Sequence, residues 1–321
     1  MEAVMASAYQ LSAEMQSFVR QCALFEPTDD SLAEMRAAYD ALCRYFTPAL
    51  PDGLLCEEHV LPAAGRDIPL RLYRPARTMP AAAWPGVLYL HGGGWMLGGL
   101  DSHAFIAASL ARECAAAVLV VDYRLAPEHV FPAAFDDCLA VWDMLRVDGL
   151  ALGIDPARVV VAGDSAGGNL AAALCLAARD RQGPPLCGQA LIYPALAAVP
   201  TEPAASEHAA APLLSRADMA YYLAQYAPDP AMHADPRLAP LAAPRLQGVP
   251  PAFVAVAEYD PLRDDGLRYV QRLQASGVAA ECHLGHGLLH GCLRFWPQGM
   301  QTARMYNALA AAITRMQAGQ T

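Results

Sequence analysis

The glycine-rich turn around Ser165 is the first place where this sequence could perform chemistry. Residues 163–168, with the sequence GDSAGG, follow an apolar run at 158–162 and precede an alanine-rich run at 169–178. A strand, a sharp turn and a helix form the context in which a G-x-S-x-G pattern holds a nucleophilic serine. Small flanking residues permit the strained turn that exposes the serine oxygen. The pattern predicts a nucleophile at Ser165, and the alternative is a tight strand-to-helix turn with an inert serine.

A serine nucleophile needs a base that accepts its proton and an acid that orients the base. Asp260 follows an apolar run at 252–257, and His290 lies in the loop after the last predicted strand, 279–284. These two residues and Ser165 would all lie at the carboxyl edge of a parallel sheet, where such sites are found. We therefore predict that His290 accepts the serine proton and that Asp260 holds the imidazole.

Three other acidic residues compete with Asp260 for the orienting role. Glu258 is expected within the strand itself, whereas Asp264 and Asp265 are expected about one helical turn beyond its end. An acid that must reach a histidine from the strand edge should lie closest to the strand end. This argument favours Asp260.

Two other histidines compete with His290 for the role of base. His283 is expected within the last strand and His286 at its end. His290 lies in a loop segment that is framed by Gly287 and Gly291, so it is the favoured base.

A second glycine-rich segment, HGGGW at 91–95, follows the buried apolar run 86–90. Three consecutive glycines carry a large entropic cost. A flexible loop would explain them poorly, and close approach of backbone N–H groups to a ligand oxygen would explain them better. In an oxyanion hole, such donors stabilise the charge that forms on a tetrahedral intermediate, and HGGG segments have this role beside a G-x-S-x-G turn.

The elements that must position these residues alternate between strands and helices. Buried apolar runs and turn residues predict strands at 56–61, 68–74, 86–90, 117–121, 158–162, 190–193, 252–257 and 279–284. Helical spacing predicts helices at 135–145, at 169–178, in a run that ends near 276, and at 298–316. The first two strands form a predicted hairpin. The fold class predicted from this order is α/β, with a mainly parallel central sheet flanked by helices.

Two regions do not follow this alternation, and we expect them to meet as a helical cap. Residues 1–47 show apolar residues at helical spacing, and either Asp30 or Ser31 could cap the second helical run, with Glu34 completing a capping box for Ser31. Residues 195–250 are rich in proline and contain one helical run, 215–226. The predicted organisation is an N-terminal part of the cap (1–47), a first part of the core (48–194), a cap insertion (195–250) and a second part of the core (251–321).

Composition limits the classes of protein that remain. The chain has 321 residues, of which 55% are apolar and 17% charged, so it can bury a sizeable core. Its net charge of −10 argues against nucleic acid or an anionic membrane as a partner. We see no signal peptide and no uninterrupted apolar run of about 20 residues. The nine cysteines are scattered singly, which predicts free thiols in a reducing cytoplasm and no metal site.

Five motifs together resemble those of the bacterial hormone-sensitive-lipase-like esterases of the GDSAG group. In chain order they are HGGGW at 91–95, YRLAPE at 123–128, GDSAGG at 163–168, DPLRD at 260–264 and HG at 290–291. The resemblance covers nearly the whole chain. It implies an α/β-hydrolase fold with a two-part cap, and carboxylester hydrolysis without a cofactor.

The same resemblance implies that the oxyanion donors are the backbone N–H groups of Gly93, Gly94 and Ala166. Two positions depart from the family pattern, Asp265 and Cys292. Neither is one of the three predicted catalytic residues. We expect these departures to bear on the acyl or alcohol pocket rather than on the chemistry.

We therefore expect a cytoplasmic carboxylesterase that acts on a small-molecule ester through an acyl-Ser165 intermediate, with no nucleic-acid or membrane partner. A preference for short acyl chains is implied by the resemblance alone. A non-catalytic small-molecule receptor on this fold is an alternative, although receptors that resemble this family lack the histidine found here at His290. An amidase or lactonase with the same three residues also fits, because fold does not decide function. A homodimer is left open.

Overall fold

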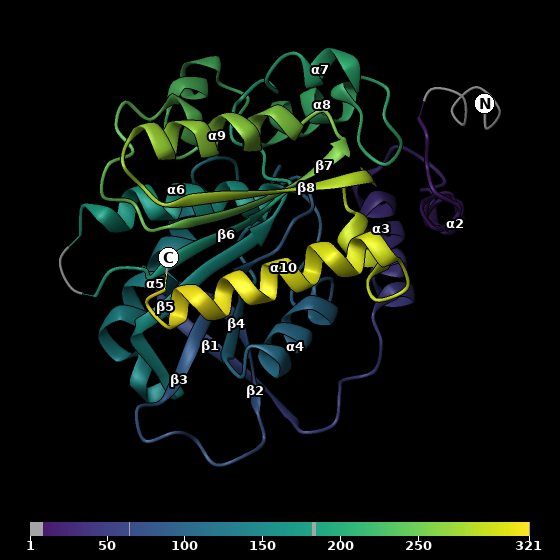
Figure 1. Ribbon diagram of the computed structural model, residues 1–321. Coiled ribbons are helices and arrows are strands. Elements are labelled where there is room, and N and C mark those ends of the chain that lie inside the picture. The colour runs from purple at the N-terminus through teal and green to yellow at the C-terminus, as the bar shows by residue number, and fades with distance from the viewer. Residues whose placement is uncertain (1–8, 64, 182–183, 321) are drawn as a thin grey trace.

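An eight-stranded sheet runs through the molecule in the computed structural model, which describes residues 9–63, 65–181 and 184–320 (Figure 1). The strands are β1 (Leu54–Ala63), β2 (Arg66–Pro75), β3 (Trp84–Leu90), β4 (Ala117–Val121), β5 (Ile154–Asp164), β6 (Gly188–Ile192), β7 (Ala252–Tyr259) and β8 (Ala280–Leu289). Their order in the sheet is β1-β2-β4-β3-β5-β6-β7-β8. The β1–β2 and β2–β4 pairs are antiparallel and the other pairs are parallel. The predicted mainly parallel α/β sheet is confirmed.

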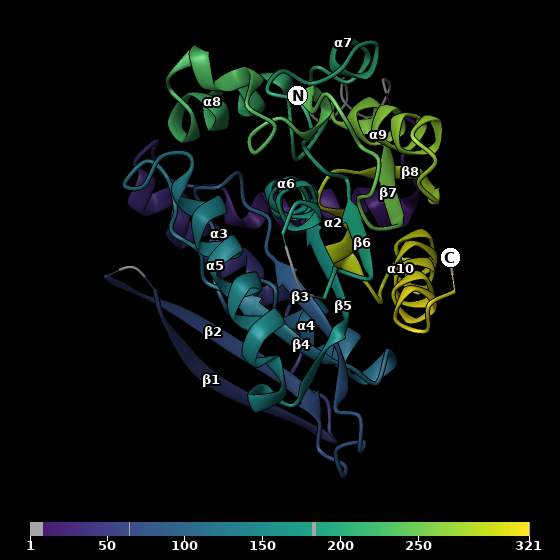
Figure 2. The same cartoon turned by 90° about the vertical axis from the view of Figure 1, so that its left-hand side faces the viewer.

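Helices cover both faces of this sheet (Figure 2). The helices are α2 (Ala13–Cys22), α3 (Leu32–Phe46), α4 (Ala104–Glu113), α5 (Ala133–Asp148), α6 (Ala166–Arg179), α7 (Ala204–Glu207), α8 (Arg216–Tyr226), α9 (Arg263–Ala275) and α10 (Met300–Gln317). Short 3-10 turns are η1 (Ala23–Phe25), η2 (Gly149–Leu152), η3 (Pro230–Ala234), η4 (Pro240–Ala242) and η5 (Cys292–Phe295). Among the described residues, no helix combines the length and apolar character that crossing a membrane requires.

Each face of the sheet buries its own apolar core. Helices α5, α6 and α9 pack on one face, and α4 and α10 pack on the other (Figures 1 and 2). Strand β4 is buried along its whole length as a result. Burial on both faces explains why the central strands are continuous apolar runs in the sequence, and why they could be predicted.

Two elements differ from the sequence-based expectation. Strand β8 continues to Leu289, so His286 lies within a strand and the predicted loop after it is shorter. The β7–β8 pairing shifts register and continues to the Tyr259–Leu289 pair, and the Gly287 N–H donates to Glu258 at 2.7 Å. Helix α4 was not predicted. It begins without a side-chain cap, so it lacks a start signal, and most of its length is buried.

The N-terminal helices agree with the prediction except in one detail, and residues 1–8 lie outside the described part of the chain. Ser31 caps α3 by accepting the Glu34 N–H at 3.2 Å. The second half of the predicted capping box is wrong. Glu34 accepts the Thr28 N–H, and the Ser31 N–H donates to Asp29 instead. A local turn at Asp29 therefore replaces the reciprocal bond.

The segment between β6 and β7 lies outside the sheet and carries α7 and α8, in green in Figure 1. The predicted helical run at 215–226 is confirmed as α8, which Ser215 caps. The start of this segment is held by the buried carboxylate of Asp265 on α9. That carboxylate accepts the N–H groups of Leu196, Ala197 and Thr201 at 2.8–2.9 Å. Asp265 therefore anchors the insertion and does not line the pocket, contrary to our expectation.

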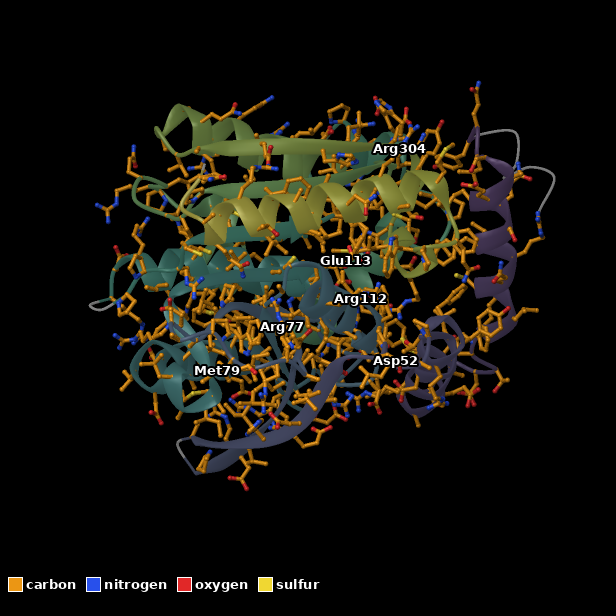
Figure 3. The ribbon with its side chains drawn as sticks, turned by 60° about the horizontal axis from the view of Figure 1, so that its bottom comes forward. Asp52, Arg77, Met79, Arg112, Glu113 and Arg304 are labelled. Carbon is orange, nitrogen blue, oxygen red and sulfur yellow. The ribbon has the colours of Figure 1, made fainter. Side chains whose placement is uncertain are left out.

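We predict that Asp265→Ala lowers the free energy of unfolding by about 3 kcal/mol or more, because two buried N–H groups and one half-buried N–H group lose their acceptor. Burial raises the pKa of the Asp265 carboxyl to about 6, so the three donors are what keeps the ionised form in place near neutral pH. Denaturant titration of both variants measures the loss, with the exposed Asp52→Ala as control (Figure 3). Equal stability of the two variants would contradict the anchoring role.

Candidate functional site

The turn that carries Ser165 is shaped by close packing against the end of β3. Ser165 has φ 54° and ψ −119°, between the end of β5 and the start of α6. A Cβ atom on Gly167 would lie 2.0 Å from the Leu90 carbonyl oxygen, and one on Gly163 would lie 2.4 Å from the Gly167 carbonyl oxygen. Both positions therefore require glycine. The serine is left on a strained turn at the sheet edge, as the motif predicts.

A chain of two short contacts joins Ser165 to His290 and Asp260. The Ser165 Oγ lies 2.9 Å from Nε2 of His290, and Nδ1 of the same ring lies 2.7 Å from Oδ2 of Asp260. Asp260 is fully buried, and its other oxygen accepts the Leu262 N–H at 2.8 Å. The structure thus brings together the three residues that were predicted to act together. A ring that donates Nδ1–H to the carboxylate presents its Nε2 lone pair to the serine hydroxyl.

The competing acids are engaged elsewhere. Asp264 accepts the Ala204 N–H at 3.0 Å and the Arg263 Nε–H at 2.9 Å. Glu258 accepts the Gly287 N–H, and Asp265 holds the loop after β6. None of these carboxylates makes a contact with His290. Within the described residues, no group of three or more His, Cys, Asp or Glu side chains could hold a metal ion.

Three backbone N–H groups belong to residues that line the same cavity as Ser165. They belong to Gly93, Gly94 and Ala166, and none of them donates a hydrogen bond to another described residue. Gly93 and Gly94 have φ values of 124° and 61°, and a Cβ on Gly93 would lie 2.2 Å from the Leu97 carbonyl oxygen. Glycine is thus required for the tight turn that carries two of these donors. Donors without a protein acceptor at this place are what an oxyanion would need.

Asp164 holds the HGGG loop against the serine turn, a role that the sequence reasoning missed. Its Oδ1 accepts the Gly92 N–H at 3.0 Å and the Tyr89 hydroxyl at 2.8 Å, and its Oδ2 lies 3.1 Å from Nε2 of His103. Burial alone would raise the pKa of Asp164, but His103 and the Tyr89 hydroxyl hold it well below its usual range. Burial lowers the pKa of His103, and the neighbouring Asp164 carboxylate acts in the opposite direction. The only sequence feature that could have indicated this role is the aspartate within the GDSAGG motif.

The cavity above Ser165 has walls from regions far apart in the sequence. Its empty space, including the open mouth, is about 1020 Å³. Helices α2 and α3 contribute apolar and aromatic side chains, as does the segment between β6 and β7. Those side chains are Phe18, Tyr39, Leu42, Leu213, Leu214, Met219 and Tyr222. A Cβ on Gly94 would lie 2.5 Å from the Tyr222 ring, so α8 closely covers the HGGG loop.

Helix α3 is tied directly to the loops around the site. Arg36 donates from Nε to the Met96 carbonyl oxygen at 3.0 Å and from Nη2 to that of Ala126 at 3.1 Å. It also pairs with Glu128, in the YRLAPE motif, at 2.7 Å. Because these bonds reach the loops after β3 and β4, the N-terminal helices are fixed over the same cavity that the insertion covers.

Comparison with known proteins gives a consistent result. Residues 87–294 match a family model described as α/β-hydrolase fold. The chain is similar to carboxylesterase NlhH of Mycobacterium tuberculosis, with 43% identity over 77% of this chain and 78% of that protein. It is also similar to ethyl acetate hydrolase of Pseudomonas putida, with 40% identity over 72% of this chain and 73% of that protein. A solved hyperthermophilic esterase of Pyrobaculum calidifontis superimposes with a TM-score of 0.88 at 34% identity, covering 95% of this chain and 98% of that one.

We predict that Asp260→Asn lowers turnover roughly ten-thousandfold, the scale of the loss when a serine-protease aspartate is replaced, because the ring is then held in the wrong tautomer. Asp264→Asn, four residues further on in the first turn of α9, is the matched control. This variant should retain most of the turnover. It should lose some stability, because the Asp264 carboxylate accepts hydrogen bonds from the Ala204 N–H and the Arg263 side chain. Turnover numbers and melting temperatures of both variants check this. A greater loss of turnover in Asp264→Asn would reverse the assignment.

Proposed function

We propose that this chain, which belongs to the hormone-sensitive-lipase-like family of α/β-hydrolases and is a carboxylic ester hydrolase, cleaves short-acyl esters through an acyl-Ser165 intermediate. The observation that carries the proposal is the contact chain Ser165–His290–Asp260, which ends at the cavity beside three backbone N–H groups without acceptors. Each catalytic role that ester hydrolysis requires has a candidate group there.

In the acylation step, His290 Nε2 takes the hydroxyl proton while Ser165 Oγ forms a bond to the ester carbonyl carbon. The carbonyl π electrons move onto oxygen, which becomes a negatively charged tetrahedral intermediate. Asp260 stabilises the imidazolium that forms. When the intermediate collapses, the bond between the carbonyl carbon and the alcohol oxygen breaks. The alcohol leaves with the proton from His290 Nε2, and the acyl group stays on Ser165.

In the deacylation step, a water molecule gives its proton to His290 Nε2 and its oxygen bonds to the acyl carbon. A second tetrahedral intermediate collapses by breaking the bond to Ser165 Oγ. The serine oxygen recovers its proton from His290, and the carboxylic acid leaves. The chain is then unchanged, and one water has been consumed for each ester.

The N–H groups of Gly93, Gly94 and Ala166 are the proposed oxyanion donors in both steps. The Ala166 donor belongs to the first residue of α6, where the helix dipole also favours negative charge. Removing one donor of an oxyanion hole typically costs about a hundredfold to a thousandfold in turnover. The hydrogen bonds of Asp164 support this role, because they fix the loop that carries two of the donors relative to the serine.

Helices α2 and α3 and the segment 195–250 are the proposed two-part cap. Both supply apolar side chains to the cavity, so they would limit the access of bulk water while still admitting the one water that deacylation consumes. A cavity covered by two apolar segments favours small soluble esters over long emulsified ones, and ethyl acetate hydrolase of Pseudomonas putida carries a short-chain ester in its name. All nine cysteines are free thiols, which supports our placing of the enzyme in the cytoplasm.

We predict that hydrolysis of p-nitrophenyl esters is fastest for acyl chains of about six carbons or fewer, because the covered cavity limits the chain it can hold. Initial rates on an acyl series from acetate to palmitate measure this, with Ser165→Ala as the inactive control. Matched amides and lactones in the same panel test the other hydrolase classes. Faster turnover of palmitate than of butyrate, or of the amides than of the esters, would contradict the proposal.

A further inference from the structure

A buried cation in the wall of the catalytic cavity has no role in the chemistry above. Arg294 lies on η5, four residues after His290, and its side chain lines the same cavity as Ser165. Of the arginines in the described part of the chain, Arg294 is the one that is buried, with 7% of its surface exposed. A guanidinium stays charged in a protein, so the cavity wall carries a positive charge at this place.

Only some of the N–H groups of the Arg294 guanidinium have a hydrogen-bond acceptor in the described part of the chain. Nη1 donates to the Ser102 carbonyl oxygen at 2.9 Å, and Nη2 donates to the Tyr39 hydroxyl at 3.2 Å. Of the five N–H groups that a guanidinium carries, these two bonds leave three without an acceptor among the described residues. The rings of Tyr39 and Phe105 lie 5.4 and 5.3 Å from its central carbon. The group is therefore held firmly but is not fully hydrogen-bonded.

No described carboxylate forms an ion pair with Arg294. Asp164 also lines the cavity, but its oxygens already accept from Gly92 and Tyr89 and contact His103. Asp164 therefore offsets the charge of Arg294 only at a distance. Burial of a charge without a hydrogen-bonded counter-charge is costly. By contrast, Arg124 forms an ion pair with the carboxylate of Asp137.

We infer that Arg294 determines specificity by binding the carboxylate of an ester substrate whose acyl or alcohol part ends in a negative charge, such as a monoester of a dicarboxylic acid. The inference rests on the proposed function, because it concerns the substrate of the same site. A planar guanidinium with free N–H groups, fixed by Ser102 and Tyr39, suits the two oxygens of a carboxylate. The substrate would supply the bonded anion that the protein lacks there. Ester hydrolysis at Ser165 is unchanged by this contact.

The test compares matched pairs of esters that differ only in charge. Monoethyl esters of malonic, succinic, glutaric and adipic acids carry a carboxylate, and the ethyl esters of the corresponding monoamides replace it with a neutral group of similar shape. The ratio of kcat/KM for acid over amide is measured for the wild type, Arg294→Met, Arg294→Lys and the exposed control Arg304→Met (Figure 3).

We expect the wild type to prefer the acid by about tenfold or more for at least one chain length, given the strength of hydrogen bonds to charged groups. Arg294→Met should reduce this ratio by about tenfold to a hundredfold, mainly through KM, because it removes the charge and the donors. Arg294→Lys should keep part of the preference, and Arg304→Met should keep all of it. A residue that only braced Ser102 and Tyr39 would affect both members of a pair equally.

Two results would overturn the inference: a wild type that prefers the amide at every chain length, or a ratio that Arg294→Met leaves within about twofold of the wild type. If Arg294→Met does not fold, the wild-type ratio still decides. Hydrolysis of neutral p-nitrophenyl acetate distinguishes a failure of the proposed function from a failure of the role assigned to Arg294. Absence of its hydrolysis by the wild type would contradict the proposed function, whereas its hydrolysis with no acid preference would contradict the role of Arg294 alone.

Discussion

Close packing of the Ser165 turn against the end of β3 is the constraint on which the rest of the site depends. The Leu90 carbonyl oxygen lies so near to Gly167 that any side chain there would overlap it. This contact sets the start of α6 directly beside the first residues of the HGGG loop. The serine hydroxyl and the proposed oxyanion donors therefore share one small volume, although Gly93 and Ala166 lie on different segments of the chain. This backbone contact alone brings the serine turn and the HGGG loop together, independently of the side-chain hydrogen bonds.

Asp164 adds a polar link at the same junction. Its carboxylate joins the residue before the nucleophile to the backbone of Gly92, to the end of β3 through Tyr89, and to the start of α4 through His103. Arg36 and Arg294 extend these links outward, from α3 to the loop at Met96 and from η5 to Ser102. The covering helices, the oxyanion loop and the nucleophile are thus connected by hydrogen bonds. The same hydrogen-bond network therefore positions the serine and holds the helices that cover the cavity.

Sequence reasoning reached the fold and the residues around Ser165 because their signals are local. Buried parallel strands such as 117–121 must be apolar throughout, and the GDSAGG turn tolerates few residue types. Asp260 and His290 follow from chain order, since each comes directly after a strand of the same sheet. Their contact with Ser165 is present in the structure, and their catalytic roles stay predictions.

The features that were missed depend on contacts between distant parts of the chain. His103 meets Asp164 across 61 positions, and Arg294 meets Ser102 across 192, so neither contact leaves a local pattern. The end of β8 was misplaced because a glycine-rich strand looks like a loop until its pairing with β7 is known. Helix α4 went unrecognised because it begins at His103 without a side-chain cap, so the sequence carries no signal for its start.

The central claim is that Ser165, activated by His290, carries the acyl group. The most direct measurement is mass spectrometry of the protein after reaction with diethyl p-nitrophenyl phosphate, which leaves a stable phosphoryl group on an activated serine. The account predicts a single adduct per chain on the peptide that contains Ser165, formed in step with the loss of esterase activity and absent in Ser165→Ala. An adduct on another residue, or loss of activity with Ser165 unmodified, would contradict it.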